Sequence, residues 1–221
     1  MFKYLHDIIY AQGENMTMID AIEVKCPVCE NDLEIYVILS TNTMARPDLD
    51  LRPAEMQRST MDNWAHECPE CGYVTSDFKK TPEITEDFLK SDSYKSCDGF
   101  EFKNPLSERF YRQHLIATES EGKFHALLYC AWACDDKDDE ENAIRIRRKC
   151  LDYIDSLEAN DDVAIQKADL LRRSKQFDKV IEEYSAKSFT EDIYNRICSF
   201  EVEKAIQKDS ACYTVDDVIN S

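Results

Sequence analysis

Apolar and polar residues alternate with the period of an α-helix through the C-terminal half of the chain. Five apolar stripes recur at the i, i+3, i+4, i+7 spacing that places side chains on one helix face. They lie within residues 124–132, 143–157, 164–171, 177–184 and 193–200. Thr190, followed by Glu191 and Asp192, is predicted to begin the last helix. The pattern predicts a helical domain.

The predicted helices recur in pairs. Ala131 precedes Ala143 by 12 residues, and Ala168 precedes Val180 by the same 12. The two units are 37 residues apart, close to the roughly 34-residue period of tetratricopeptide (TPR) repeats. The segment SKQFDKVIEEY resembles the turn and second helix of that repeat, although Arg147 stands where the repeat prefers an aromatic residue. We expect a TPR-like array, with a plain helical bundle as the alternative.

The chain has a different character before residue 104. The β-branched and aromatic run LEIYVIL at 33–39 predicts a strand, and most of the prolines lie in this part. Both C-x-x-C pairs also lie here. The sequence therefore predicts an α+β, mostly α fold, with a zinc-ribbon-like module and long insertion over residues 1–104 and the helical domain over 105–221.

Two cysteine pairs carry the clearest chemistry. CPVC at 26–29 and CPEC at 68–71 are C-x-x-C turns separated by 38 residues. Two thiolates spaced in this way can bind one ion from a tight turn, and two such turns complete a tetrahedron. Gly72 can adopt the positive φ that the turn after the second pair needs, whereas Glu30 occupies the equivalent place after the first.

We therefore expect a structural zinc ion bound by Cys26, Cys29, Cys68 and Cys71. Four free thiols, two redox pairs or iron in a rubredoxin-like site are the alternatives. Four thiolates leave no open coordination position for catalysis. His66 could replace one thiolate, but no His-x-Glu or His-Glu-x-x-His pattern accompanies it. Most of the other six cysteines are expected in the core.

The net charge of the chain limits the classes of partner that it is expected to bind. The net charge of −18 repels phosphate backbones and anionic membranes, so nucleic acid is an unfavoured partner. The basic run RIRRK at 145–149 follows an acidic run, and it is expected to form a solvated face with pairs such as Glu141 with Arg145. The longest apolar run, at 127–134, is shorter than the ~20 residues that span a bilayer. No N-terminal leader pattern is recognised, so a cytoplasmic protein is expected.

The order of several blocks resembles an uncharacterised bacterial family. The blocks are CPVC, RPAEMQRSTMDNWAHECPECGY, ALLYCAWACDD, ADLLRRSKQFDKVIE and SACYTV. Members of that family carry an N-terminal double C-x-x-C segment like a zinc ribbon, followed by tetratricopeptide-like helices. The resemblance implies zinc ligation by the four paired cysteines and implies no known activity.

The segment RPAEMQRSTMDNW is the place to look for a function beyond folding. A short helix over 54–63 would bring Glu55 and Arg58 near one face, beside Arg52 and Trp64, with His66 close by. Arginine forks in such a cluster could bind a carboxylate or phosphate. The alternative is that Arg52 and Arg58 pair with acids and hold the insertion against the helical domain.

Three functions follow as hypotheses. The first is a scaffold protein that binds a protein or peptide through its helical array. The second is an enzyme with a site between the zinc module and the helices, although no catalytic motif supports it. The third, and weakest, is a nucleic-acid-binding zinc ribbon.

Overall fold

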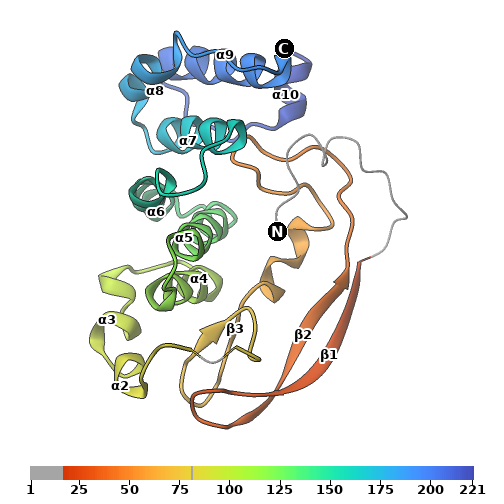
Figure 1. Ribbon diagram of the computed structural model, residues 1–221, viewed down its shortest axis with the longest axis vertical. Coiled ribbons are helices and arrows are strands. Elements are labelled where there is room, and N and C mark those ends of the chain that lie inside the picture. Colours follow the sequence, from red (N-terminus) through yellow and green to blue (C-terminus); the bar gives the residue numbers. More distant parts are fainter. Residues whose placement is uncertain (1–16, 81) are drawn as a thin grey trace.

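The C-terminal helices follow one another as a stack along the molecule (Figure 1). The computed structural model describes residues 17–80 and 82–221. The stack consists of α4 (Pro105–Ile116), α5 (Ser120–Asp135), α6 (Glu140–Ile154), α7 (Asp161–Arg173), α8 (Phe177–Tyr184) and α9 (Asp192–Ile206), with α10 (Val215–Ile219) beside α9. Four of the five predicted stripes fall within one of these helices, and the stripe at 143–157 extends past the end of α6 to Leu157. None of the described helices has both the length and the apolar character needed to cross a bilayer.

Side-chain caps explain where several helices begin. Asn104 accepts a hydrogen bond from the Ser107 N–H at the start of α4, and Asn160 caps α7 in the same way. The prediction that Thr190 begins α9 is wrong, because Glu191 occupies the cap position and makes no side-chain cap. Helices α4 and α10 lie outside the predicted stripes.

One turn geometry recurs along the stack. Asp138, Lys175 and Lys208 each have positive φ, at 53°, 61° and 56°, after α5, α7 and α9 respectively. In each turn the N–H of the next residue donates to the carbonyl five residues earlier, as in a Schellman ending. The three turns are 37 and 33 residues apart. The periodicity found in the sequence therefore has a counterpart in backbone conformation.

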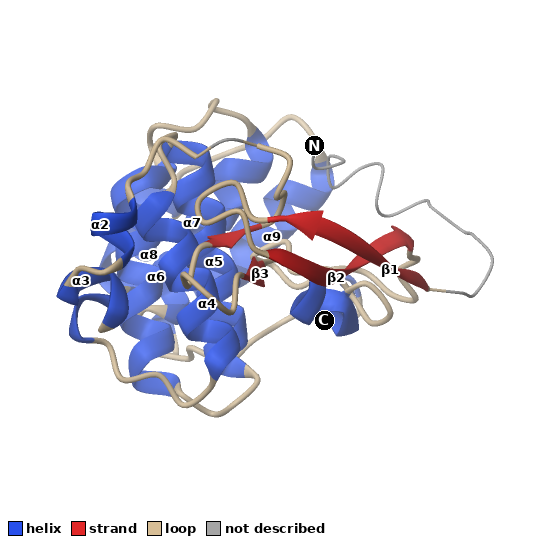
Figure 2. Ribbon diagram, turned by 90° about the horizontal axis from the view of Figure 1, so that it is seen from below, coloured by secondary structure: helices blue, strands red, loops and turns tan. Residues whose placement is uncertain are grey.

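The N-terminal part consists of two β-hairpins and short helices. Strands β1 (Met18–Lys25) and β2 (Asp32–Ser40) pair antiparallel, with Ile22 opposite Ile35, and this ribbon lies beside the helices (Figure 2). Strands β3 (His66–Glu67) and β4 (Val74–Thr75) form the second hairpin. The remaining elements are η1 (Arg58–Asn63), α2 (Glu86–Leu89), α3 (Asp92–Lys95) and η2 (Cys97–Gly99). The strand predicted at 33–39 is confirmed, whereas β1 is an addition.

Three apolar clusters form the core. The first joins α4, α5 and α6 to Met61, Ala65 and Val74 of the N-terminal part. The second joins α7 to α10 and includes Leu49. The third lies under the two cysteine turns and is closed by Tyr94 and Leu89. The division at residue 104 stays a prediction, since the first two clusters both include residues from before it.

Residues 41–65 lie between the two cysteine turns and are here called the inter-knuckle segment. They run along the helical stack. Asp50 is fully buried there and accepts hydrogen bonds from the indole N–H of Trp132 on α5 at 2.7 Å and from Arg173 on α7 at 3.0 Å. The backbone N–H of Leu49 donates to the Tyr213 carbonyl. The segment thus ties α5, α7 and the chain before α10 together.

The basic run at 145–149 does not form the solvated face that the sequence predicts. Arg147 is only 2% exposed and forms a bidentate ion pair with Asp135. Arg145 donates to Asn142 and lies over the Phe100 ring instead of pairing with Glu141. The cause is packing, because α6 faces both α5 and α7 and its polar side chains reach acids on neighbouring elements.

Candidate metal centre

Each cysteine pair occupies the turn of a β-hairpin. The first pair lies between β1 and β2, and the second lies between β3 and β4. The backbones match: the N–H of Cys26 donates to the Asn31 carbonyl, and the N–H of Cys68 donates to the Tyr73 carbonyl. In both turns the N–H of the fourth residue after the first cysteine, Glu30 or Gly72, donates back to that cysteine's carbonyl.

The two turns also share a left-handed residue after the second cysteine. Gly72 has a φ of 73°, as the sequence predicts, and Glu30 has a φ of 59°. An L residue adopts this region at some energetic cost, so Glu30 reproduces the glycine geometry under strain. The first turn is therefore as regular as the second in shape despite its different residue.

The four sulfur atoms lie together at the point where the hairpins meet. The Sγ atoms of Cys26 and Cys71 are 3.7 Å apart, those of Cys29 and Cys68 are 3.6 Å apart, and all four lie within 4.8 Å of one another. These separations are too long for disulfides, and all four cysteines are free. A tetrahedral ion with Zn–S bonds of about 2.3 Å requires sulfur separations of ~3.8 Å. The cluster could hold a metal ion.

Backbone N–H groups point at the first sulfur of each turn. Burial raises the pKa of the Cys26 thiol and outweighs the N–H groups of Cys29 and Val28, which lower it. At Cys68 burial acts in the same direction, but the N–H groups of Cys71 and Glu70, together with the hydrogen bonds of Cys29 and Cys26, outweigh it and the pKa is lowered. Such N–H donors stabilise the thiolate form that a metal requires.

The surrounding helices brace the second turn. The Tyr94 hydroxyl on α3 donates to the Gly72 carbonyl at 2.7 Å. Arg112 on α4 forms a 2.8 Å ion pair with Glu67, the residue just before Cys68. Sequence reasoning missed Tyr94 and Arg112, because neither belongs to a motif and both reach the turn only through the packing of α3 and α4.

The arginines of the inter-knuckle segment are paired with acids. Arg52 is buried and its Nη2 lies 2.6 Å from Asp136 at the end of α5. Arg58 forms a 2.6 Å ion pair with the buried Asp48. Glu55 accepts a hydrogen bond from Ser59. The expected helix over 54–63 is present only as the 3₁₀ helix η1, Arg58–Asn63.

Trp64 and His66 lie apart from these ion pairs. The Trp64 ring meets Tyr129 and Trp132 of α5 edge-on, at centroid distances of 5.1 Å and 6.3 Å, and its N–H donates to Thr60. His66 is in β3 opposite Thr75, next to the metal site but outside the cysteine cluster. The structure therefore brings together the four predicted cysteines. The other five predicted residues are spread along residues 52–66 and do not form one cluster.

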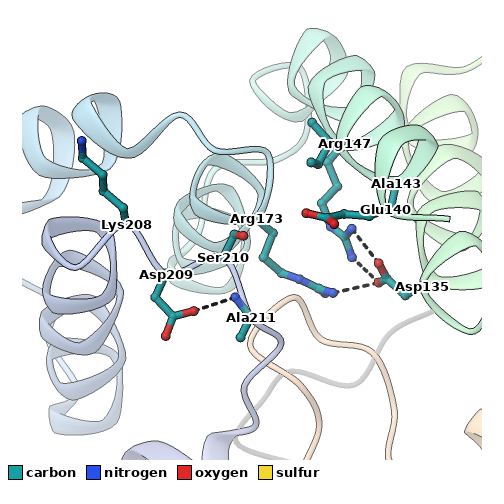
Figure 3. Close-up of a pocket in the computed structure, with 10 residues that line it drawn as sticks. Asp135, Glu140, Ala143, Arg147, Arg173, Lys208, Asp209, Ser210 and Ala211 are labelled. Carbon is teal, nitrogen blue, oxygen red and sulfur yellow. Dashed lines mark hydrogen bonds and ion pairs between the residues drawn. The ribbon is translucent and has the colours of Figure 1, made fainter. Parts of the chain in front are cut away.

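Of the cavities lined by the described residues, two border the predicted site residues or the buried ion pairs. One of about 440 Å³ is lined by Arg58 and Ser59 of the segment, by Arg109 at the start of α4, and by Asp136 and Lys137 after α5. The other, of about 490 Å³, lies between α6 and residues 208–211 (Figure 3).

Buried ion pairs form one wall of the larger cavity. Arg147 and Arg173 converge there on Asp135 (Figure 3). Asp50 lies behind them, 3.0 Å from Arg173. Two arginines and two aspartates thus form a charge-balanced cluster in which Asp50, Arg147 and Arg173 are buried and Asp135 is partly exposed.

Comparisons with known proteins identify no relative of this chain. No family model matches the chain, and no curated protein or solved structure does so either. The family resemblance seen in the sequence stays a prediction, and the chain is described here as a helix-rich protein with a four-cysteine cluster that could hold a metal ion.

Proposed function

We propose that the chain is a zinc-binding scaffold protein. Cys26, Cys29, Cys68 and Cys71 hold one structural zinc ion, and the helical domain is a TPR-like array that serves protein or peptide binding. The observation that carries the zinc assignment is the near-tetrahedral spacing of four free thiols in two matching turns. A closed set of four thiolates stabilises a fold and offers no position for substrate.

Metal analysis tests the zinc assignment. Purified protein is expected to contain about one zinc ion per chain. Cys68→Ser should lose the ion together with the protection of β3 and β4 against hydrogen exchange, because metal binding and folding of the module are coupled. Cys212→Ser, which changes an exposed thiol outside the cluster, is the control and should keep both.

Two outcomes would overturn the assignment. A Cys68→Ser protein that retains full zinc and full stability would show that the ligand set is wrong. Iron in place of zinc, with the absorption of a thiolate–iron site, would keep the ligands and replace the metal.

Three observations support the partner-binding part of the proposal. The recurring turns after α5, α7 and α9 fit a repeat array, and such arrays present extended binding surfaces. Four of the large apolar side chains that are exposed lie on β1 and β2: Met18, Ile19, Tyr36 and Leu39. The net charge of −18 favours a protein or peptide over nucleic acid.

An enzyme with a site between the zinc module and the helices is the second candidate. The 440 Å³ cavity favours it, because Arg58, Arg109 and Lys137 converge there from three separate segments. Arg58 is paired with Asp48, whereas Arg109 donates only to the backbone carbonyls of Asp62 and Ala65, so Arg109 and Lys137 are the groups that suit a carboxylate or phosphate. The enzyme would be favoured over the scaffold if the protein turns over a carboxylate or phosphate substrate and Arg109→Gln abolishes this activity without changing the zinc content.

A further inference from the structure

A buried group of three charged side chains lies between α7 and α9. Arg172 donates through Nη2 to Asp169 at 2.7 Å and through Nε to Glu201 at 2.5 Å. All three side chains are at most 1% exposed. Two carboxyl groups therefore share one guanidinium in the interior of the second core cluster.

If both carboxyl groups are ionised, the group has two negative charges and only one positive charge. Asp169 Oδ2 and Glu201 Oε1 are both buried, and neither accepts a hydrogen bond from any donor among the described residues. Two ionised carboxylates beside one arginine would also leave a net negative charge in the core, which is strongly unfavourable. One proton placed between the two carboxyl groups supplies the missing donor and removes the excess charge.

Neighbouring charges do not supply that balance. Asp50, Arg147 and Arg173 face Asp169 from the inter-knuckle segment, α6 and α7, and they belong to the charge-balanced cluster that also contains Asp135. The other titratable groups that interact electrostatically with this group are Tyr184, Cys198, Cys212 and Asp209, and each is neutral or acidic. None of these adds a positive charge beyond those already paired.

We propose that Asp169 and Glu201 share one buried proton at neutral pH, carried by Glu201, and that this proton holds the C-terminal end of the chain closed. Burial, reinforced by Asp169, raises the pKa of Glu201 to about 8. Burial also raises the pKa of Asp169. The inference concerns a pH-dependent closure and does not depend on the zinc assignment.

Arg172 connects the proton to the chain end. Its Nη1 donates to the backbone carbonyls of Asp209 at 3.1 Å and Ala211 at 2.7 Å. Residues 209–215, here called the strap, then pair with the inter-knuckle segment through Leu49 N–H to the Tyr213 carbonyl and Val215 N–H to the Pro47 carbonyl. When the proton leaves, two repelling carboxylates require water, and we expect the strap over them to open.

Infrared spectroscopy and hydrogen exchange test the proposal together. The wild-type protein should show the carbonyl band of a buried protonated carboxylic acid near pH 6 and lose it by about pH 10. Over the same range, exchange of the Leu49 and Val215 amides, corrected for intrinsic rates, should accelerate by about tenfold or more. Both changes should have the same midpoint.

Glu201→Gln removes the titratable proton and keeps the size of the side chain. Its amide can donate to Asp169 and accept from Arg172, so the strap should stay protected at alkaline pH and the acid band should be absent. Glu203→Gln, an exposed change on the same helix, should behave like wild type. A wild-type protein without the band, or a Glu201→Gln strap that opens as the wild-type strap does, would overturn the proposal.

Discussion

His114 shows how burial sets the behaviour of a single side chain. It is 6% exposed, packs against Tyr111 and Tyr153, and its Nδ1 lies 3.2 Å from the Lys123 carbonyl. Burial lowers the pKa of His114 to about 4, and Lys149 and Lys123 add to the effect. The ring is therefore neutral in the folded protein over the physiological range.

The consequence is a loss of stability in acid. In the unfolded chain His114 protonates near its ordinary pKa of about 6.5, whereas the folded protein resists protonation until about pH 4. Its contribution is complete above about pH 6.5 and is lost as pH falls to about 4, by about 3 kcal/mol. Denaturant unfolding of wild type and His114→Asn, measured at pH 7 and about pH 5, checks this. Equal pH dependence in the two proteins would contradict it.

At the scale of elements, the inter-knuckle segment behaves as part of the core of the stack. Asp50 joins Trp132, Arg173 and the backbone N–H of Arg52, and Gln166 donates to its carbonyl. The segment therefore fixes the relative placement of α5 and α7, whose direct neighbours along the stack are α4, α6, α8 and α9.

Removing the charge of Asp50 should be costly. Asp50→Asn leaves Arg147 and Arg173 with one carboxylate in a buried place, and we expect a loss of about 3 kcal/mol in the free energy of unfolding. Asp155→Asn, which changes the exposed partner of Lys167, is the control and should cost less than about 1 kcal/mol. Equal losses in the two variants would show that burial of the cluster is not what matters.

The same elements show what the sequence could and could not predict. Apolar periodicity located α5 to α9, and the C-x-x-C spacing located all four thiols, because both signals are local. Asp50 carries no local signal: its partners Trp132 and Arg173 lie far along the chain, and only folding brings them together. The short strand pairs β3 and β4 and the cap positions also depend on packing rather than on pattern.

At the scale of the whole molecule, the large apolar side chains that are exposed among the described residues concentrate on the β1–β2 ribbon. A two-stranded ribbon is only marginally stable alone, and its outer residues Tyr36 and Leu39 are 53% and 59% exposed. Exposed apolar groups gathered in one place are typical of interaction surfaces. The ribbon lies beside the helices rather than under them (Figure 2).

A partner that docks on the ribbon should depend on these side chains. We expect a protein that co-purifies with wild type to be lost from Tyr36→Ser/Leu39→Ser, with unchanged zinc content and helical circular dichroism. Ile206→Ser on α9, where the side chain is 64% exposed, is the control and should retain the partner. Retention by the double variant would exclude the ribbon as the docking surface.

The contact between Trp64 and Trp132 has a practical consequence. These are the two tryptophans of the chain, and they lie on opposite sides of the seam between the inter-knuckle segment and α5. Tryptophan emission, excited selectively over the 11 tyrosines, therefore reports on this seam and needs no added label. Time-resolved emission during chelation of the metal or a rise in pH would show whether the seam opens before, with or after the rest of the molecule.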